Sequence, residues 1–159
     1  MTGGQAPSLM SQARPIDAAL VDEVWREIVQ YPPDQVQFEA RAFLEQQPAV
    51  AAVAALASEP FEAPVQQASF GLAFLFFKVL ERSLGAPFPR VAEERLQAAW
   101  QANVERLAGS PESLASALVG HVLSVFYGGD SGPYDARVRA SLVLLLETLT
   151  EAVDVGTEL

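Results

Sequence analysis

Residues 64–84 read PVQQASFGLAFLFFKVLERSL, and this stretch decides the fold. Its middle, residues 68–77, is apolar on nearly every side of a helix. A bilayer span needs about 20 apolar residues, and this run reaches only half that length before the charged residue Lys78. A helix that is apolar all round is typical of the centre of a helical protein, so we predict a buried helix over 64–84, ended by Gly85. Four phenylalanines would lie at its heart: Phe70, Phe74, Phe76 and Phe77.

The residues before this stretch predict three shorter helices. Apolar side chains recur every four positions over residues 15–30, and the Tyr-Pro-Pro that follows ends the pattern. A second helix is expected over 34–47, and Pro48 interrupts it. An alanine- and valine-rich segment, residues 49–57, predicts a short buried helix. The apolar side chains of the second helix that we expect to face the core form a stripe of Val36, Ala40, Phe43 and Leu44.

The residues after it continue the helical pattern. Prolines at 87 and 89 predict a rigid connector, which leads into a helix over 90–107. A serine, a proline and a glutamate at 110–112 are a helix start signal for the next segment, which should run to about residue 127. A glycine-rich turn over 128–133 precedes a last helix over 135–153. The side chains expected to face inward from 90–107 are Leu96, Trp100, Val104 and Leu107.

No stretch shows the strict alternation of apolar and polar residues that indicates a strand. The predicted fold is therefore all-α: a compact, single-domain bundle of six or seven helices around the central Phe-rich helix. The domain should cover residues 14–155. Residues 1–13, rich in glycine, serine and glutamine, are expected to form a disordered lead-in, and residues 156–159 a tail.

Composition excludes several classes of function. The 159 residues carry a formal net charge of −10, half of them are hydrophobic, and none is cysteine. Lys78 is the only lysine, and the arginines form no basic stripe, so nucleic-acid binding and attachment to an anionic membrane are not expected. Without cysteine there is no disulfide, thiolate metal site or cysteine nucleophile. Because residues 1–13 lack an apolar signal segment, we predict a cytoplasmic protein.

His121 is the only histidine, and it falls within an apolar helical stripe. One interpretation is a neutral imidazole buried in the core and bonded to a backbone carbonyl or a hydroxyl. The other is a general base or a single metal ligand. A zinc site needs more histidine or cysteine than the chain contains, so no metal and no cofactor are predicted. The stripe consists of Leu114, Leu118, His121, Val122 and Val125.

The turn after this helix offers one candidate ligand site. Tyr127, Asp130 and Tyr134 would rim a small pocket, with His121 one or two turns behind it. The turn follows a helix and lacks the lysine of a phosphate-binding loop, so an ordinary helix end with a turn suffices to explain it. We identify no catalytic residues, because the chain contains no G-x-S-x-G motif and no second histidine.

Small residues recur on the opposite side of the same helix, at Ser116, Gly120 and Ser124. Such a stripe allows another helix to approach closely. It is expected to form either a crossing inside the bundle or an interface with a protein partner or a second copy of the chain. The acidic pairs at 22–23, 93–94 and 147–151 are expected to lie on solvated faces.

These observations predict a non-catalytic helical protein that acts by protein–protein contact or self-association. The alternative is a helical enzyme or small-ligand binder whose site lies around His121 and the loop over residues 128–134. The phenylalanine cluster itself is expected to fill the core, although it could also line an apolar ligand pocket.

Overall fold

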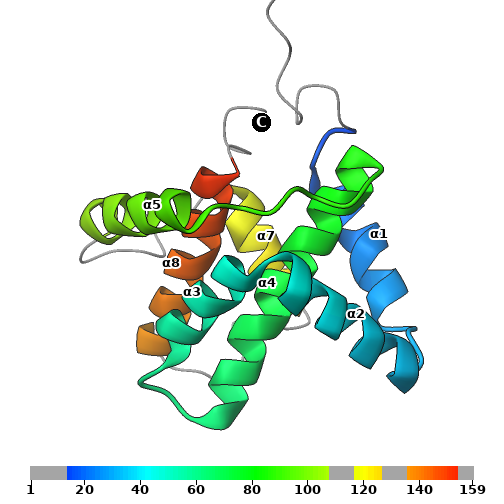
Figure 1. The fold of residues 1–159 in the computed structure, drawn as a ribbon, viewed down its shortest axis with the longest axis horizontal. Helices are drawn as coiled ribbons and strands as arrows, with labels where there is room; N and C mark the ends of the chain where they lie inside the picture. The colour runs from blue at the N-terminus through cyan, green and yellow to red at the C-terminus, as the bar shows by residue number, and fades with distance from the viewer. Residues whose placement is uncertain (1–13, 108–116, 127–135, 154–159) are drawn as a thin grey trace, which may run out of the picture.

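A computed structural model describes residues 14–107, 117–126 and 136–153. Within these residues the chain forms seven α-helices and no strand, which confirms the predicted compact all-α fold (Figure 1). The helices are α1 (Ala18–Ile28), α2 (Pro33–Gln46), α3 (Pro48–Ser58), α4 (Ala63–Leu84), α5 (Glu93–Arg106), α7 (Ala117–Phe126) and α8 (Ala136–Ala152). The start signal at 110–112 and the turn over 128–133 lie outside the described residues.

The Phe-rich helix α4 lies at the centre, as predicted. It packs against α1, α3, α7 and α8, and Gly85 ends it in the left-handed conformation with φ of 75°. Among the described helices, α4 alone is long and apolar enough to cross a bilayer, yet most of that stretch is buried inside the bundle. The central packing of α4 is therefore a sufficient reason for its composition.

Aromatic rings hold the C-terminal half of α4 to its neighbours. The Phe77 side chain is 2% exposed. Its ring centroid lies 5.8 Å from that of Phe43 on α2 and 5.7 Å from that of Phe88 in the connector after α4. One side chain thus joins three segments that are distant in sequence.

The first helix begins at Ala18, three residues later than the predicted range of 15–30. The Asp17 side chain accepts a hydrogen bond of 2.9 Å from the backbone N–H of Leu20 and so caps α1. Just before this cap, the backbone N–H of Arg14 donates to the Ser83 carbonyl at 2.9 Å. The chain therefore enters the bundle beside the end of α4.

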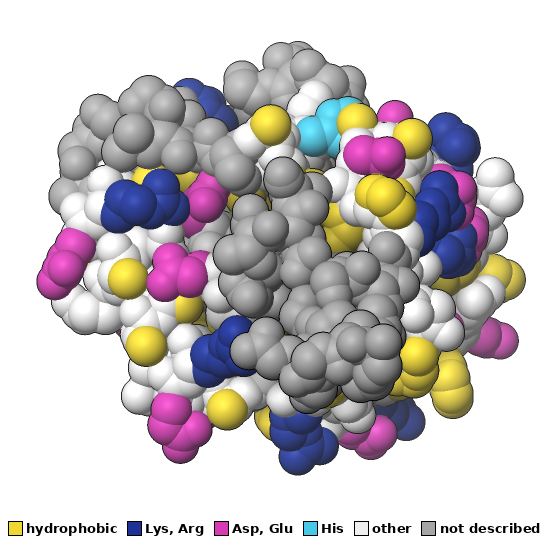
Figure 2. Space-filling view, turned by 90° about the horizontal axis from the view of Figure 1, so that it is seen from above, with side chains coloured by type: hydrophobic (Ala, Val, Ile, Leu, Met, Phe, Trp, Pro, Cys, Tyr) yellow, Lys and Arg dark blue, Asp and Glu magenta, His cyan; other side chains and the backbone are white. Residues whose placement is uncertain are grey.

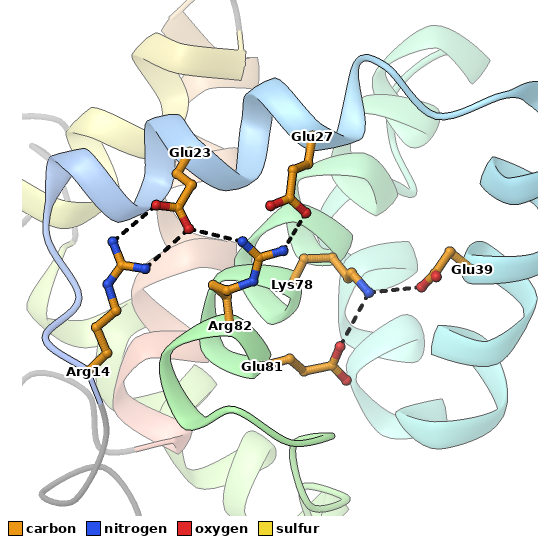
Figure 3. A network of polar contacts seen from close by, with 7 residues as sticks. All are labelled: Arg14, Glu23, Glu27, Glu39, Lys78, Glu81 and Arg82. Atoms are coloured by element: carbon orange, nitrogen blue, oxygen red, sulfur yellow. Dashed lines mark hydrogen bonds and ion pairs between the residues drawn. The ribbon is translucent and has the colours of Figure 1, made fainter.

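A network of ion pairs joins α1 to the same end of α4 (Figure 3). Glu23 accepts hydrogen bonds from Arg14 at 3.1 Å and from Arg82 at 2.9 Å, and Arg82 also contacts Glu27. The hydrogen bond from Arg14, followed by that from Arg82, lowers the pKa of Glu23. The hydrogen bond from Arg82 lowers the pKa of Glu27. The network favours the ionised carboxylates in the folded state.

We expect this network to make stability depend on pH in the acid range. Because folding lowers the pKa of Glu23 and Glu27 below the ordinary value of 4.5, their contribution is present above about pH 4.5 and is lost as the pH falls through the folded values. In Arg82→Gln, the midpoint of urea unfolding should fall less between neutral and acid pH than in the wild type. Arg95→Gln, which removes an exposed arginine of α5, is the control and should follow the wild type. A slope unchanged by Arg82→Gln would contradict this assignment.

The junction between α2 and α3 is fixed by Gln47, whose side chain is almost completely buried. Its amide nitrogen donates to the carbonyls of Pro89, at 2.9 Å, and Phe88, at 3.3 Å. Its amide oxygen accepts from the backbone N–H of Val91 at 2.9 Å. Arg90 donates to two carbonyls at the end of α2. Hydrogen bonds from the connector after α4 therefore fix the position of the junction between α2 and α3.

Helix α5 packs against α8 through polar side chains that the sequence did not predict to be buried. Asn103 is fully buried and donates to Glu151 at 3.0 Å, whereas Val104, which was predicted to face inward, is 39% exposed. Glu147 was predicted to be solvated, but it is buried and pairs with Arg106 at 3.1 Å. The expectation for Glu147 is wrong because Arg106, from the neighbouring helix, supplies its counter-charge.

Helix α2 is much less buried than its stripe predicted. Of the four stripe residues only Phe43 is in the core, whereas Val36 is 44% and Leu44 46% exposed. The prediction is wrong because no described helix covers that side of α2, which lies at the edge of the molecule (Figure 1). The short helix α3 is buried on one face, by Val50 and Val53, while Leu56 on its other face is exposed.

Candidate functional site

His121 lies on α7 and reaches the surface, where histidine is shown in cyan (Figure 2). Its side chain is 32% exposed, and its Nε2 lies 2.9 Å from Oδ1 of Asp22 on α1. The expectation of a buried imidazole bonded to a carbonyl or a hydroxyl is therefore wrong. Asp22 on α1 is itself 44% exposed, so the pair lies at the surface and joins α7 to α1.

The pair of His121 and Asp22 lacks most of the features of a catalytic centre. A carboxylate that holds an imidazole nitrogen is one part of a general-base arrangement, but the base also needs a reacting group within hydrogen-bond reach. Among the described residues there is no group of three or more metal-ligating side chains. Tyr127, Asp130 and Tyr134 lie outside the described residues, so the ligand pocket that they would form with His121 stays a prediction.

The small residues of α7 do not form a close crossing at Gly120. Gly120 is exposed, and a Cβ atom added there would meet no described atom within 4 Å. The close approach occurs instead at Gly71 of α4, where an added Cβ would lie 3.2 Å from the ring of Phe126. Ser124 is half-buried, and Ser116 lies outside the described residues. An interface at this stripe stays a prediction.

Two clefts flank Lys78, which sequence reasoning did not select as a site residue. A cleft of about 480 Å³ lies between α2, α4 and the connector, and a cleft of about 360 Å³ lies between α1 and α4. Both are lined by Lys78, Glu81 and Pro87. The sequence signal was present, because the only lysine directly follows the apolar middle of the Phe-rich helix.

The Lys78 ammonium bridges α2 and α4 (Figure 3). Its Nζ lies 2.8 Å from Glu39, 3.4 Å from Glu81 and 6.0 Å from the ring centroid of Phe74. Burial opposes the charge, but the contacts with Glu39 and Glu81 outweigh it and raise the pKa of Lys78. Lys78 is therefore protonated and links α2 to α4. A protonated ammonium group can act neither as a nucleophile nor as a general base.

The most distinctive surface is apolar and is concentrated on one part of the chain. Among the described residues, six large hydrophobic side chains are exposed, and five of them fall between residues 29 and 56. The sixth, Val104, lies on α5, which is across the molecule from α2 (Figure 1). We call the five residues the arm surface: Val29, Val36, Phe38, Leu44 and Leu56. On α2, Val36 and Leu44 lie on one side of the helix and Phe38 on the opposite side.

The arm surface adjoins a hollow on α3. A cavity of about 560 Å³ lies between α3 and α4, and its lining includes Ala51, Ala55 and Leu56 of α3 and Phe70 of α4. The ring of Phe70 also packs edge-on against Phe43 of α2, with the centroids 5.4 Å apart. Phe70 thus lines this hollow and also contacts the buried residue through which α2 joins the core.

The outermost stripe of α2 combines one ring with both signs of charge. Phe38 is 72% exposed, and Asp34 and Arg41 lie one helical turn before and after it. Both charged side chains are exposed, and neither forms an ion pair with another described residue. Charged groups of opposite sign that flank an open ring are suited to contact with another protein surface.

Comparisons with known proteins identify no relative: no protein-family model, no curated protein and no solved structure matches this chain.

Proposed function

We propose that this protein is non-catalytic and acts by contact between its arm surface and another protein chain. The observation that carries the proposal is the clustering of five of the six exposed large hydrophobic side chains within 28 residues. Exposed apolar residues scattered singly are ordinary, whereas three such residues on one sparsely buried helix, α2, give a partner chain an apolar surface to cover.

The way α2 is attached supports this proposal. Phe43 is its only buried residue, and polar contacts with Lys78, Arg90 and the Phe88 carbonyl also attach it to the rest of the molecule. The side chains of Val36 and Leu44 therefore remain largely in water, although apolar burial stabilises by about 25 cal/mol per Å². A partner that covers them supplies that stabilisation on binding. The arrangement fits recognition by a helix face better than it fits catalysis.

A photoreactive residue placed on each side of the molecule tests the proposal. Gln37 of α2 and Gln101 of α5 are both exposed, so a photo-cross-linking amino acid at either position should leave the fold intact. In cells that express the protein at its natural level, we expect protein adducts from position 37 and none from position 101. Adding Leu44→Asp should abolish the adducts, because it places a charge within the apolar contact.

Val104→Asp is the matched control, since it adds the same charge to the exposed hydrophobic residue that lies outside the arm surface. It should leave the adducts from position 37 unchanged. Circular dichroism and the thermal midpoint check that both variants fold. The proposal is wrong if position 37 gives no protein adduct, or if Leu44→Asp and Val104→Asp reduce the adducts equally.

A further inference from the structure

We infer that the Phe38 side of α2, the part of the arm surface that faces away from Val36 and Leu44, binds a second copy of this chain through an antiparallel α2–α2 contact about a two-fold axis near Phe38. This inference rests on the proposed function and specifies its partner. An antiparallel helix pair needs one accessible helix face per copy and a pattern of side chains that is complementary to itself when reversed. Helix α2 has both features.

The accessible face is the outer stripe of α2. With 3.6 residues per turn, Asp34, Phe38 and Arg41 fall on one side of the helix. All three are exposed, and α2 lies at the edge of the bundle (Figure 1). A second α2 can therefore lie along this stripe without displacing any described helix.

The charges on this stripe are self-complementary only in the antiparallel direction. When two copies cross at Phe38, Asp34 of each copy lies opposite Arg41 of the other, and the two Phe38 rings meet at the axis. A parallel arrangement would place each charge opposite its own kind. Because Asp34 and Arg41 have no ion pair with another described residue, the contact adds two ion pairs without breaking one.

The size of this contact sets its strength. A single pair of 14-residue helices buries less than the 1,200–2,000 Å² that is typical of a stable interface. The net charge of −10 on each copy also opposes association at long range. We therefore expect a monomer–dimer equilibrium that depends on protein concentration. A strongly basic partner is the alternative that the net charge would favour, and the experiment separates the two.

A charge-reversal experiment measured by sedimentation equilibrium tests the inference. Arg41→Glu and Asp34→Arg each replace two attractions with two repulsions, so each variant alone should dimerise about tenfold or more weakly than the wild type. An equimolar mixture of the two variants should dimerise again, because opposite charges then meet at both ends of the contact. Arg95→Glu on α5, another exposed arginine, is the control and should dimerise like the wild type.

The outcomes separate this inference from the proposed function. The inference is overturned if the wild type stays monomeric at high concentration, if the reversed variants dimerise like the wild type, or if their mixture fails to dimerise. If position 37 still gives adducts that Leu44→Asp abolishes and that contain a different protein, the proposed function stands and only the second copy is excluded. Should Asp34→Arg weaken α2 itself, as circular dichroism would show, Asp34→Asn with Arg41→Gln tests the same pairs without charge reversal.

Discussion

Replacing Phe77 with alanine should lower the free energy of unfolding by about 3–5 kcal/mol, the range measured for truncation of large buried side chains. The Phe77 ring is almost fully buried and packs against rings from α2, from α4 itself and from the connector. Its removal leaves a cavity at the meeting point of three segments, and the surrounding backbone cannot close over it without moving several helices. Urea unfolding followed by circular dichroism measures the loss.

Phe38→Ala is the matched control, because the same atoms are removed from a ring that is 72% exposed. It should change the stability of the monomer by less than about 0.5 kcal/mol. Phe77→Leu, which keeps most of the apolar volume, should recover a large part of the loss. Equal effects of Phe77→Ala and Phe38→Ala would show that α4 is not the packed centre of the protein.

Replacing Gln47 with leucine should cost about 1–3 kcal/mol, although leucine has a similar size and is more apolar. The amide of Gln47 satisfies the Val91 N–H and the carbonyls of Phe88 and Pro89 within the interior. Leucine would leave the Val91 N–H buried without a partner, and this desolvation exceeds the gain from apolar packing. The effect therefore has the opposite sign from that expected of hydrophobicity alone.

Gln46→Leu is the control for this substitution. Gln46 neighbours Gln47 and contacts the same Phe88 carbonyl, at 3.2 Å, but it is only half-buried, so water can replace its hydrogen bond. We expect its effect to be within about 0.5 kcal/mol. A Gln47→Leu protein as stable as the wild type in a urea titration would show that the corner between α2 and α3 does not need the amide.

The central helix could be predicted from sequence because its composition leaves no alternative. A segment that is apolar on all sides must be covered, and the glycine at position 85 marks its end without any knowledge of its neighbours. In α2 the period of apolar residues correctly identified a helix. The same period did not show which residues of α2 are buried. Phe43 and Leu44 belong to one stripe, but only Phe43 has neighbouring helices packed against it.

The polar contacts between helices could not be predicted from the sequence for a related reason. Glu147 belongs to a ladder of acids that resembles a solvated face, and its burial depends on Arg106, which lies 41 residues earlier. The exposure of His121 depends on Asp22, which is 99 residues away. Sequence spacing reports on neighbours within a helix, whereas these pairs form only after the helices have packed.

The sparse attachment of α2 has a consequence for motion within the native state. Since only the Phe43 side chain is buried, releasing α2 from the bundle exposes far less apolar surface than unfolding α4 or α8 does. The cost of such a partial opening is correspondingly lower than that of global unfolding. We therefore expect backbone amides of α2 to exchange their hydrogens through this local route, and those of α4 to stay protected until the whole protein unfolds.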